Sequence, residues 1–394
     1  MKKVLFLFLV LFLSPVLALE LPVDITAESA IVINNTDDLV VYTKNADDKK
    51  ILASLTKIMT AYTVIDKVEN LNTVVEITEE DIHGLEGFTC IGLEAGMIVN
   101  YRELLYGLIL QSGADAAKAL GNHIAGSNEK FVELMNEEAE KLDLRNTRFA
   151  DTFGGSDDNI STAREVGILL QEALKKPEFN KIFKTNYYVF SSGITATNYT
   201  RNFAIYHGFD EFAITGSKSG YTPEAGILLA STSTIDNTEY IIIVMKCSEN
   251  EKLSTHVIDT YRIINYIKKN KYENRKVLEK NKQLPAIKVK NSTIDTYLPT
   301  IKKDIYEYLN EEELSNLTLE YNLTKEIDSN FEKGDNLGYI DIKVKDEVID
   351  TYNIFLEDEL FASTASSTSS IPIIAILLGV IIILVFINLL LSKN

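Results

Sequence analysis

Short apolar runs near the start of the chain are separated by a polar segment. Residues 30–33 read Ala-Ile-Val-Ile, residues 39–42 read Leu-Val-Val-Tyr, and residues 34–38 between them read Asn-Asn-Thr-Asp-Asp. Apolar runs joined by such a polar segment are typical of a β-hairpin. Apolar residues then recur at helical spacing from Leu55 to Ile65, which predicts a helix soon after the hairpin.

Helical and strand patterns continue through the middle of the chain. Helical spacing predicts further helices over residues 101–110, 114–125, 128–142 and 162–174. Ser161 is the expected N-cap of the last of these. Strand and helix patterns then predict strands over residues 226–233 and 239–246 and an amphipathic helix over residues 254–269. Because strands lie at both ends of this region, we expect an α+β domain whose sheet is assembled from distant segments and covered by helices.

The pattern changes after about residue 275. Apolar and polar residues alternate over four short stretches, residues 286–290, 317–321, 339–344 and 349–352. Such alternation predicts a small β-rich domain with one polar face, which we place at residues 275–357. It contains no cluster of chemically useful side chains, so a spacer role is expected. The larger domain is accordingly placed at residues 20–274.

The first residues have the features of a secretory signal peptide. Lys2 and Lys3 precede an apolar run over residues 4–13, and the small residue Ala18 follows. A positive start, a short apolar run and a small residue at its end mark such signals. We expect a signal peptide over residues 1–19, cleaved near Ala18; the alternative is an N-terminal membrane anchor.

The last residues have the features of a membrane anchor. A Ser/Thr-rich linker is expected over residues 358–371, and residues 373–391 are apolar except for Asn388. Some nineteen helical residues at about 1.5 Å each span roughly 28 Å, close to the thickness of the hydrocarbon layer. A buried core helix is the alternative, but the run carries no amphipathic stripe. We therefore expect a single-pass transmembrane helix over residues 372–391, with the globular part held outside the cytoplasmic membrane.

Charge and composition exclude several classes of protein. The net charge of −18 argues against nucleic-acid binding, since no stripe of Lys and Arg is present to neutralise phosphates. Cys90 and Cys247 are the two cysteines; a secreted chain could pair them, but no framework of cysteines is present, and we expect two free buried thiols. The four histidines lack metal-ligand spacing, so each is expected in a core or surface role and no metal or cofactor is predicted.

The strongest chemical signal is the run Ala-Ser-Leu-Thr-Lys at residues 53–57. Residues three apart share one face of a helix, so the Ser54 hydroxyl can lie beside the Lys57 amine. A serine hydroxyl needs an adjacent base to become a nucleophile, and a lysine serves only when its pKa is depressed. A single Ser-x-x-Lys match is common on protein surfaces, so it carries weight only with partner motifs.

Two later segments provide such partners. Ser112 lies at the junction of two predicted helices, in Gln-Ser-Gly-Ala-Asp, and Lys218 lies in Gly-Ser-Lys-Ser-Gly-Tyr-Thr, which leads into a predicted strand. The trio Ser-x-x-Lys, Ser-Asp-Asn and Lys-Thr-Gly marks penicillin-binding proteins and class A β-lactamases. Variants of all three elements occur here in that order.

Residues 27–268 resemble the D-alanyl-D-alanine carboxypeptidase family, low-molecular-weight penicillin-binding proteins of the serine peptidase type. The likeness includes Leu-Glu-Ala-Gly at residues 93–96 and Lys-Ser-Gly-Tyr-Thr at residues 218–222, and residues 275–356 resemble the family's β-rich second domain more loosely. The resemblance implies a β-lactamase/transpeptidase-like domain with an antiparallel sheet, helices over it and an all-helical part. It also implies removal of D-alanine from peptidoglycan stem peptides ending in D-Ala-D-Ala, and covalent inhibition by β-lactams.

The resemblance also implies a role for each motif residue. Ser54 would be the acylated nucleophile, Lys57 its general base, and Ser112 a proton relay. Lys218 and the Ser219 hydroxyl, with Gly220 beside them, would bind the terminal carboxylate of the substrate. The backbone N–H groups of Ser54 and Tyr221 would form the oxyanion hole.

One position departs from the family pattern. Ala114 stands where most relatives have asparagine, so the amide that would bond the substrate and Lys57 is missing. This leaves two alternatives to an active carboxypeptidase: a catalytically weak penicillin-binding protein that binds wall peptides, and a β-lactamase. The second would need an efficient deacylating group such as a loop glutamate before Leu-Asn, whereas Glu133 precedes Leu-Met-Asn inside a helical pattern.

Overall fold

The computed structural model describes residues 23–249 and 254–360. Those residues form two compact units, one of residues 23–275 and 307–316 and the other of residues 276–306 and 317–360. The expected signal peptide, most of the expected linker and the expected transmembrane helix lie outside the described residues. Within them, every helix is too short or too polar to span a bilayer.

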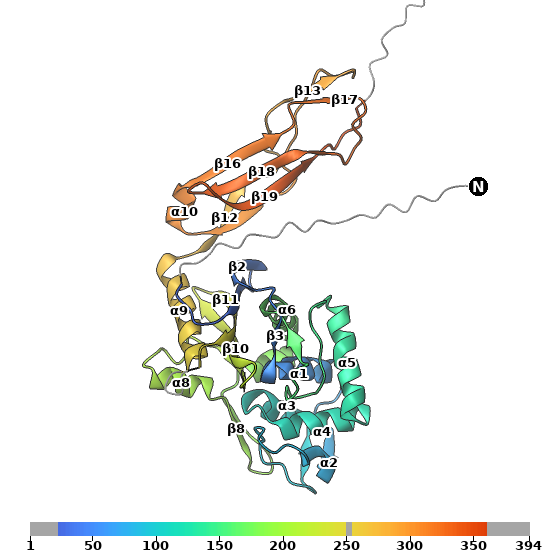
Figure 1. The fold of residues 1–394 in the computed structure, drawn as a ribbon, viewed down its shortest axis with the longest axis vertical. Coiled ribbons are helices and arrows are strands. Elements are labelled where there is room, and N and C mark those ends of the chain that lie inside the picture. Colours follow the sequence, from blue (N-terminus) through green and yellow to red (C-terminus); the bar gives the residue numbers. More distant parts are fainter. Residues whose placement is uncertain (1–22, 250–253, 361–394) are drawn as a thin grey trace, which may run out of the picture. The chain divides into compact units, whose positions relative to one another are not determined.

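The first unit is built around a five-stranded antiparallel sheet (Figure 1). Its spatial order is β2 (Leu39–Lys44), β1 (Ser29–Asn34), β11 (Thr238–Cys247), β10 (Gly226–Ile235) and β9 (Gly216–Thr222). Strand β1 pairs with β11, with Ile31 opposite Ile243. The sheet therefore joins segments from both ends of the unit, as the sequence predicts.

Alternating side chains of the sheet enter two separate hydrophobic cores. Ile31 and Ile33 of β1 lie in the core shared with the helical part of the unit, whereas Ala30 and Val32 lie in a core with Val257 of α9 (Thr255–Asn270). This is the two-residue period of a strand that is covered on both faces. Helix α6 (Ala163–Leu174) covers β1 and β11 on one side, and α9 covers β10 and β11 on the other.

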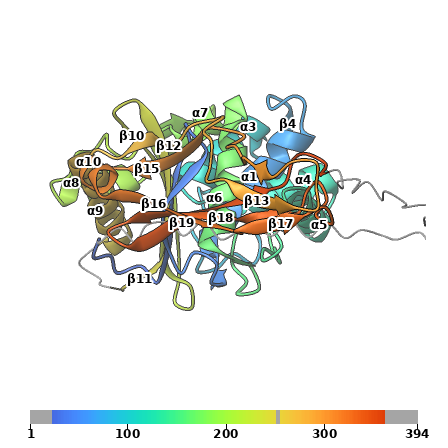
Figure 2. The ribbon, with the colours of Figure 1, turned by 90° about the horizontal axis from the view of Figure 1, so that it is seen from above.

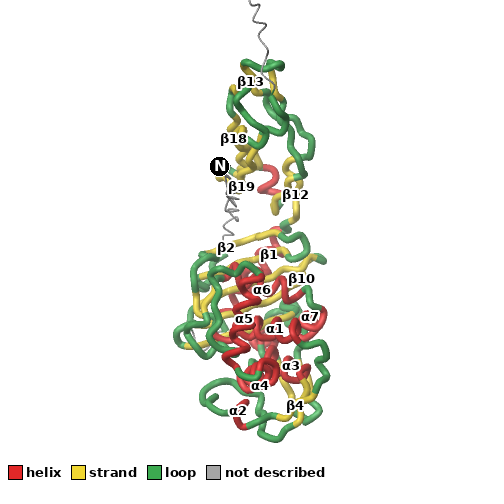
Figure 3. Tube along the Cα trace, turned by 90° about the vertical axis from the view of Figure 1, so that its right-hand side faces the viewer, coloured by secondary structure: helices red, strands yellow, loops and turns green. Residues whose placement is uncertain are grey.

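The helical part gathers on one side of the sheet, around α1 (Thr56–Lys67) (Figure 3). Every residue of α1 from Thr56 to Val64 is buried, because the helix is surrounded by neighbours rather than lying at a surface. The helices that contact it are α3 (Tyr101–Leu110), α4 (Ala114–Ala125), α5 (Asn128–Lys141), α6 and α7 (Pro177–Phe183). The turn that leads into α1 also contacts β9, the edge strand of the sheet.

Shorter elements complete the first unit. They are β3 (Lys50–Ile51) paired with β6 (Ile160–Ser161), β4 (Val74–Glu76) paired with β5 (Ile98–Asn100), β7 (Tyr187–Val189) paired with β8 (Thr195–Thr197), and the helices α2 (Glu79–Ile82) and α8 (Thr200–Tyr206).

The second unit is β-rich, as its alternation predicts. Its larger sheet has the order β16 (Leu317–Leu323), β18 (Asn336–Val344), β19 (Glu347–Phe355), and Figure 2 shows these strands side by side. The other described elements from residue 273 onward are β12 (Glu273–Leu278), β13 (Ile287–Lys290), β14 (Thr296–Tyr297), β15 (Ile305–Leu309), α10 (Glu311–Ser315) and β17 (Glu326–Asp328).

Most predicted elements are confirmed, with three corrections. The N-cap of α6 is Thr162, whose side chain accepts a hydrogen bond from the Glu165 N–H, and not Ser161, which belongs to β6. The segment containing Lys218 is itself a strand, β9, rather than a lead into one. Both cysteines are free, but only Cys247 is buried; Cys90 is half-buried.

Candidate active site

Ser54 lies in a short 3-10 turn, Ala53–Leu55, that runs directly into α1. One turn further along, the Lys57 amine donates a hydrogen bond to the Ser54 hydroxyl oxygen over 3.1 Å. Ala53 has a left-handed backbone with φ of +42°, a conformation that is costly for a residue with a Cβ and is held here by its surroundings. The predicted pairing of Ser54 with Lys57 is confirmed.

Lys57 is almost completely buried, with 2% of its surface exposed. Burial lowers the pKa of its amine to about 7, against the opposing effect of the Asp151 and Asp115 carboxylates. The amine also donates to the Phe153 carbonyl oxygen over 2.6 Å. Near neutral pH a large fraction of Lys57 is therefore uncharged and able to accept a proton from Ser54.

Ser112 occupies the junction of α3 and α4 in a left-handed conformation, φ +63°. The junction is fixed by Asp115, whose buried carboxylate accepts hydrogen bonds from the N–H groups of Ile91, Gly92 and Leu93. The Ala114 N–H in turn donates to the Thr89 carbonyl over 2.8 Å. One carboxylate thus holds both the Ser112 turn and the loop that brings Thr89 to the site.

Strand β9 forms the sheet edge opposite Ser54. Its order in the sheet leaves one side of β9 without a strand partner within the five-stranded sheet, and that side faces the Ser54 turn. A Cβ added to Gly220 would lie 3.1 Å from the Ser54 backbone nitrogen. Glycine at this position lets the strand approach the start of α1 closely enough to share a substrate with it.

Lys218 lies on β9 but is turned away from Ser219. Successive side chains of a strand point to opposite faces, and Lys218 is buried with 2% exposure whereas Ser219 is half-buried. The Lys218 amine donates to the Ser219 carbonyl over 2.6 Å. Burial, with a smaller effect of the Lys57 charge, lowers the pKa of Lys218 well below its usual value.

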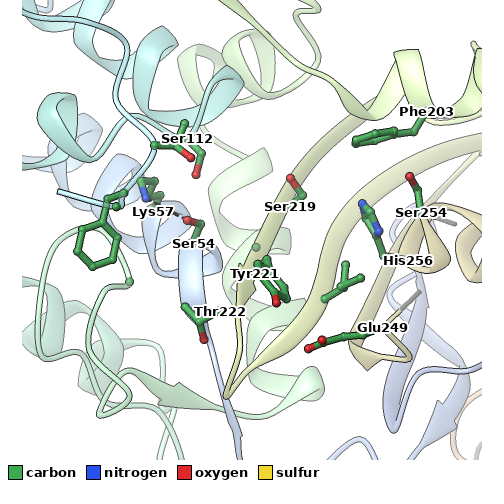
Figure 4. A pocket seen from close by; sticks show the side chains of 16 residues that line it. Ser54, Lys57, Ser112, Phe203, Ser219, Tyr221, Thr222, Glu249, Ser254 and His256 are labelled. Atoms are coloured by element: carbon green, nitrogen blue, oxygen red, sulfur yellow. Dashed lines mark hydrogen bonds between the residues drawn. The ribbon is translucent and has the colours of Figure 1, made fainter. Parts of the chain in front are cut away.

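One open pocket of about 580 Å³ collects the other predicted residues (Figure 4). Its walls include Ser54, Lys57, Ser112, Ser219, Gly220 and Tyr221. In Figure 4 the first three converge on one side and Ser219 and Tyr221 rise from β9. Lys218 is not among the lining residues that the structure describes; by strand alternation its side chain lies on the same face of β9 as Gly220, the face that packs against the Ser54 turn.

No sequence motif predicts the far wall of the pocket. It is formed by Phe203 of α8, Ile227, Glu249, Ser254 and His256. His256 is 6% exposed, burial lowers its pKa to about 4, and its Nδ1 has no hydrogen-bond partner among the described residues. Its role is therefore in the pocket wall. These residues share no spacing with the motifs, so only the folding of α9 over the sheet reveals them.

Comparison with known proteins identifies the family in which this fold and these motifs occur. Residues 17–249 match the family model described as D-alanyl-D-alanine carboxypeptidase, and residues 272–360 match the C-terminal domain of penicillin-binding protein 5. The D-alanyl-D-alanine carboxypeptidase DacF of Bacillus subtilis is 27% identical over 82% of this chain and 83% of its own length. The carboxypeptidase DacC of Escherichia coli is 33% identical over 63% of this chain and 66% of its own length.

Solved structures agree with the fold. The carboxypeptidase DacD of Francisella tularensis superposes with a TM-score of 0.71 at 19% identity, covering 88% of this chain and 96% of that one. The Streptomyces K15 DD-transpeptidase superposes with a TM-score of 0.56 at 30% identity, covering 62% of this chain and 97% of that one. With a family model matching more than half of its residues, this chain belongs to the D-alanyl-D-alanine carboxypeptidase family of low-molecular-weight penicillin-binding proteins.

Proposed function

We propose that this protein is a serine-type D-Ala-D-Ala carboxypeptidase that removes the terminal D-alanine of peptidoglycan stem pentapeptides through an acyl-enzyme on Ser54. The observation that carries the proposal is the hydrogen bond of 3.1 Å between Ser54 and a buried Lys57 whose pKa is about 7. This is the arrangement that a serine nucleophile requires at neutral pH. It lies in a pocket large enough for a peptide.

In the acylation step, uncharged Lys57 takes the proton of the Ser54 hydroxyl as its oxygen attacks the carbonyl carbon of the penultimate D-alanine. The backbone N–H groups of Ser54 and Tyr221 stabilise the negative charge that develops on the carbonyl oxygen. The proton then passes, with the help of Ser112, to the nitrogen of the terminal D-alanine. The peptide bond breaks, D-alanine leaves, and Ser54 carries the ester.

In the deacylation step, a water molecule attacks the ester carbonyl. Ser112 and Lys57 accept the proton of that water and return one to the Ser54 oxygen as the ester bond breaks. The products are the shortened stem peptide and the free Ser54 hydroxyl. β-Lactams acylate the same hydroxyl and act as covalent inhibitors.

The terminal carboxylate of the substrate is held beside β9. The Ser219 hydroxyl lines the pocket and donates a hydrogen bond to it, while Lys218, buried on the opposite face of β9 from Ser219, attracts it electrostatically. Because burial depresses the pKa of Lys218, an arriving carboxylate raises that pKa again. Carboxylate binding and Lys218 protonation therefore favour one another, which selects substrates with a free C-terminus.

The hydrogen bond from Lys57 to the Phe153 carbonyl supports an active enzyme rather than a weak binder of wall peptides. A buried amine without a partner would be costly, and the missing amide at position 114 would remove one partner of Lys57. The hydrogen bond of 2.6 Å from Lys57 to the Phe153 oxygen supplies another. Lys57 therefore remains positioned beside Ser54 although Ala114 offers only a methyl group.

We further propose that the protein acts outside the cytoplasmic membrane, anchored through residues 372–391. The support is the sequence: a signal-like N-terminus and an apolar run of membrane-spanning length. The substrate class agrees, since peptidoglycan is extracytoplasmic.

Release of D-alanine from a pentapeptide ending in D-Ala-D-Ala tests the enzymatic proposal. The wild-type protein should release D-alanine and turn over a bound fluorescent β-lactam slowly, whereas Ser54→Ala should do neither. Rapid hydrolysis of the β-lactam without D-alanine release would identify a β-lactamase instead. Stable labelling without D-alanine release would identify a binding protein.

A further inference from the structure

Helix α8 exposes most of its apolar side chains. Only Thr200 and Ala204 are buried in Thr200–Tyr206. Tyr199, at the N-cap, is 54% exposed, Phe203 is 40% exposed and Tyr206 is 76% exposed. Single exposed aromatic side chains are common on protein surfaces, but contiguous exposed apolar patches mark binding sites.

These three aromatic residues lie along one flank of the helix. Residues separated by four and then three positions share a helix face. At about 1.5 Å per residue the row formed by Tyr199, Phe203 and Tyr206 is roughly 10 Å long. We call it the aromatic row. The exposed Ile205 and the Arg201–Phe212 pair, whose guanidinium lies 4.3 Å from the ring centroid, belong to the other flank.

The aromatic row continues the wall of the catalytic pocket. Phe203 lines that pocket, and its ring packs edge-on against His256 at 6.0 Å between centroids. Figure 4 shows Phe203 on the far side of Ser219 from Ser54. A substrate reaching Ser54 from a larger polymer would therefore meet the row just outside the pocket.

The row carries no charge, and it belongs to a chain with a net charge of −18. Electrostatics therefore oppose an anionic membrane or an acidic partner at this surface. An uncharged ligand with flat, ring-shaped apolar faces fits better. Pyranose sugars have such faces, because their axial C–H groups pack against aromatic rings while their hydroxyls stay in water.

We propose that the aromatic row binds the glycan strand to which the stem peptide is attached. This inference rests on the proposed function, since it assigns to the same substrate a second contact outside the pocket. The row holds the sugar chain while the peptide enters toward Ser54, so it raises the local concentration of stem peptides in polymeric peptidoglycan. It contributes nothing to a short soluble peptide that lacks sugars.

The test compares the wild-type full chain, in detergent, with the Tyr199→Ser/Tyr206→Ser double variant. The double variant should bind chito-oligosaccharides, uncharged chains of β-1,4-linked N-acetylglucosamine, about tenfold more weakly, since two ring contacts are lost. Its D-alanine release from intact peptidoglycan should fall in parallel, while release from a soluble pentapeptide stays unchanged. Phe212→Ser is the matched control: an equally exposed aromatic residue near α8, on the other flank, whose loss should leave glycan binding unchanged.

Amide hydrogen exchange of residues 199–206 distinguishes glycan binding from contact with a lipid bilayer or with a second copy of the chain. Chito-oligosaccharides should slow exchange there in the full chain. Slowing on reconstitution into lipid vesicles without glycan would assign the row to the bilayer, and slowing that grows with protein concentration would assign it to a second copy. Either result overturns the proposal, as does equal glycan binding by the double variant. Failure of the soluble pentapeptide assay in the wild-type protein would instead refute the proposed function.

Discussion

The chemistry that we propose for the site depends on the protonation of one amine. Lys57 has a pKa of about 7 because burial destabilises its charged form more than Asp151 and Asp115 stabilise it. Ser112, by contrast, is positioned by its left-handed backbone and by Asp115, whose carboxylate ties the residue 91–93 loop to the start of α4. Burial therefore sets the protonation of Lys57, whereas backbone conformation and packing set the position of Ser112.

We predict that penicillin acylates Ser54 and no other residue. Ser54 is the serine whose hydroxyl accepts a hydrogen bond from the buried Lys57 amine, and it lies in the pocket with both partner motifs. Intact-mass measurement and peptide mapping after labelling should find one adduct, on Ser54. Labelling that survives Ser54→Ala, or an adduct on Ser112, would contradict the assignment.

The pKa of Lys57 predicts the pH dependence of acylation. Only the uncharged amine accepts a proton, and the folded-state pKa is about 7, so the acylation rate constant should rise through pH 7 and level off above it. Well below that pH it should fall about tenfold for each pH unit. Stopped-flow acylation with a chromogenic β-lactam measures the profile. Lys57→Arg should abolish the reaction, since a guanidinium stays charged, and a profile that is flat between pH 5 and 8 would exclude Lys57 as the base.

Ala114→Asn should raise the acylation rate by about tenfold, roughly 1.4 kcal/mol. An asparagine amide could donate to the substrate carbonyl while its oxygen accepts from Lys57, and both bonds strengthen as charge develops in the transition state. Ala114 is 1% exposed, so thermal stability must be measured alongside the rate. A slower rate in a stable variant would show that the site has been rebuilt around the methyl group.

At the scale of elements, β9 determines how closely a substrate can approach the nucleophile. The strand pairs with β10, with Ser219 opposite Leu229, and its other side is the edge that faces Ser54. An extended peptide can add to such an edge through backbone hydrogen bonds. In the function that we propose, the strand would supply backbone partners for the substrate as well as the Ser219 hydroxyl.

Gly220→Ala should impair catalysis more than stability. The new methyl would lie 3.1 Å from the Ser54 nitrogen and 3.4 Å from the Leu52 carbonyl oxygen, so the strand and the Ser54 turn must move apart by a few tenths of an ångström. A displacement of this kind misaligns reacting groups that depend on close placement, and we expect the acylation rate to fall about tenfold or more. Stopped-flow acylation and thermal unfolding together test this. An unchanged rate would show that β9 does not set the geometry of the nucleophile.

The elements that sequence patterns predict are those whose apolar residues enter a core. Helix α3 matches its predicted range over residues 101–110, because the run is mostly apolar and every residue in it except Arg102 is buried. Strand β9 was not recognised, since Gly-Ser-Lys-Ser-Gly is polar and glycine-rich and its strand form comes from pairing with β10. Helix α8 was missed for the opposite reason: its apolar side chains face solvent.

The candidate site, like the fold, could be predicted from the sequence only in part. Ser54, Lys57 and Ser112 lie within short motifs whose spacing has chemical meaning, and the structure brings all three to one pocket. The Phe153 carbonyl and His256 come from distant segments and carry no motif. Their positions depend on tertiary packing alone. The burial of Lys218 on the opposite face of β9 from Ser219 likewise follows from strand alternation, which the motif does not reveal.

At the scale of the molecule, the chain combines a catalytic unit with a β-rich unit that lacks a comparable cluster of reactive side chains among its described residues. Within residues 23–249 and 254–360, no three His, Cys, Asp or Glu side chains are grouped so that they could hold a metal ion. The chemistry proposed for the protein accordingly uses groups of the first unit only. The role that we propose for the apolar run after Ser370 is to attach the protein to the membrane.

We predict that truncation after Ser370 releases a soluble, active protein. Residues 362–370 consist of Ala, Ser and Thr and offer no large apolar surface to bury. Ending the chain after them should therefore not disturb a folded domain. The apolar run that follows is the expected anchor, and the −18 charge of the full chain opposes adsorption to anionic lipid. The truncated chain should therefore appear in the soluble extracytoplasmic fraction and release D-alanine from a soluble pentapeptide at the wild-type rate.

The control is the full chain, which should remain with the membrane and resist extraction by high salt, as an apolar helix does and an electrostatic contact does not. If the truncated chain still sediments with membranes after a salt wash, a second anchor exists, and N-terminal sequencing would show whether it is a signal peptide left uncleaved near Ala18.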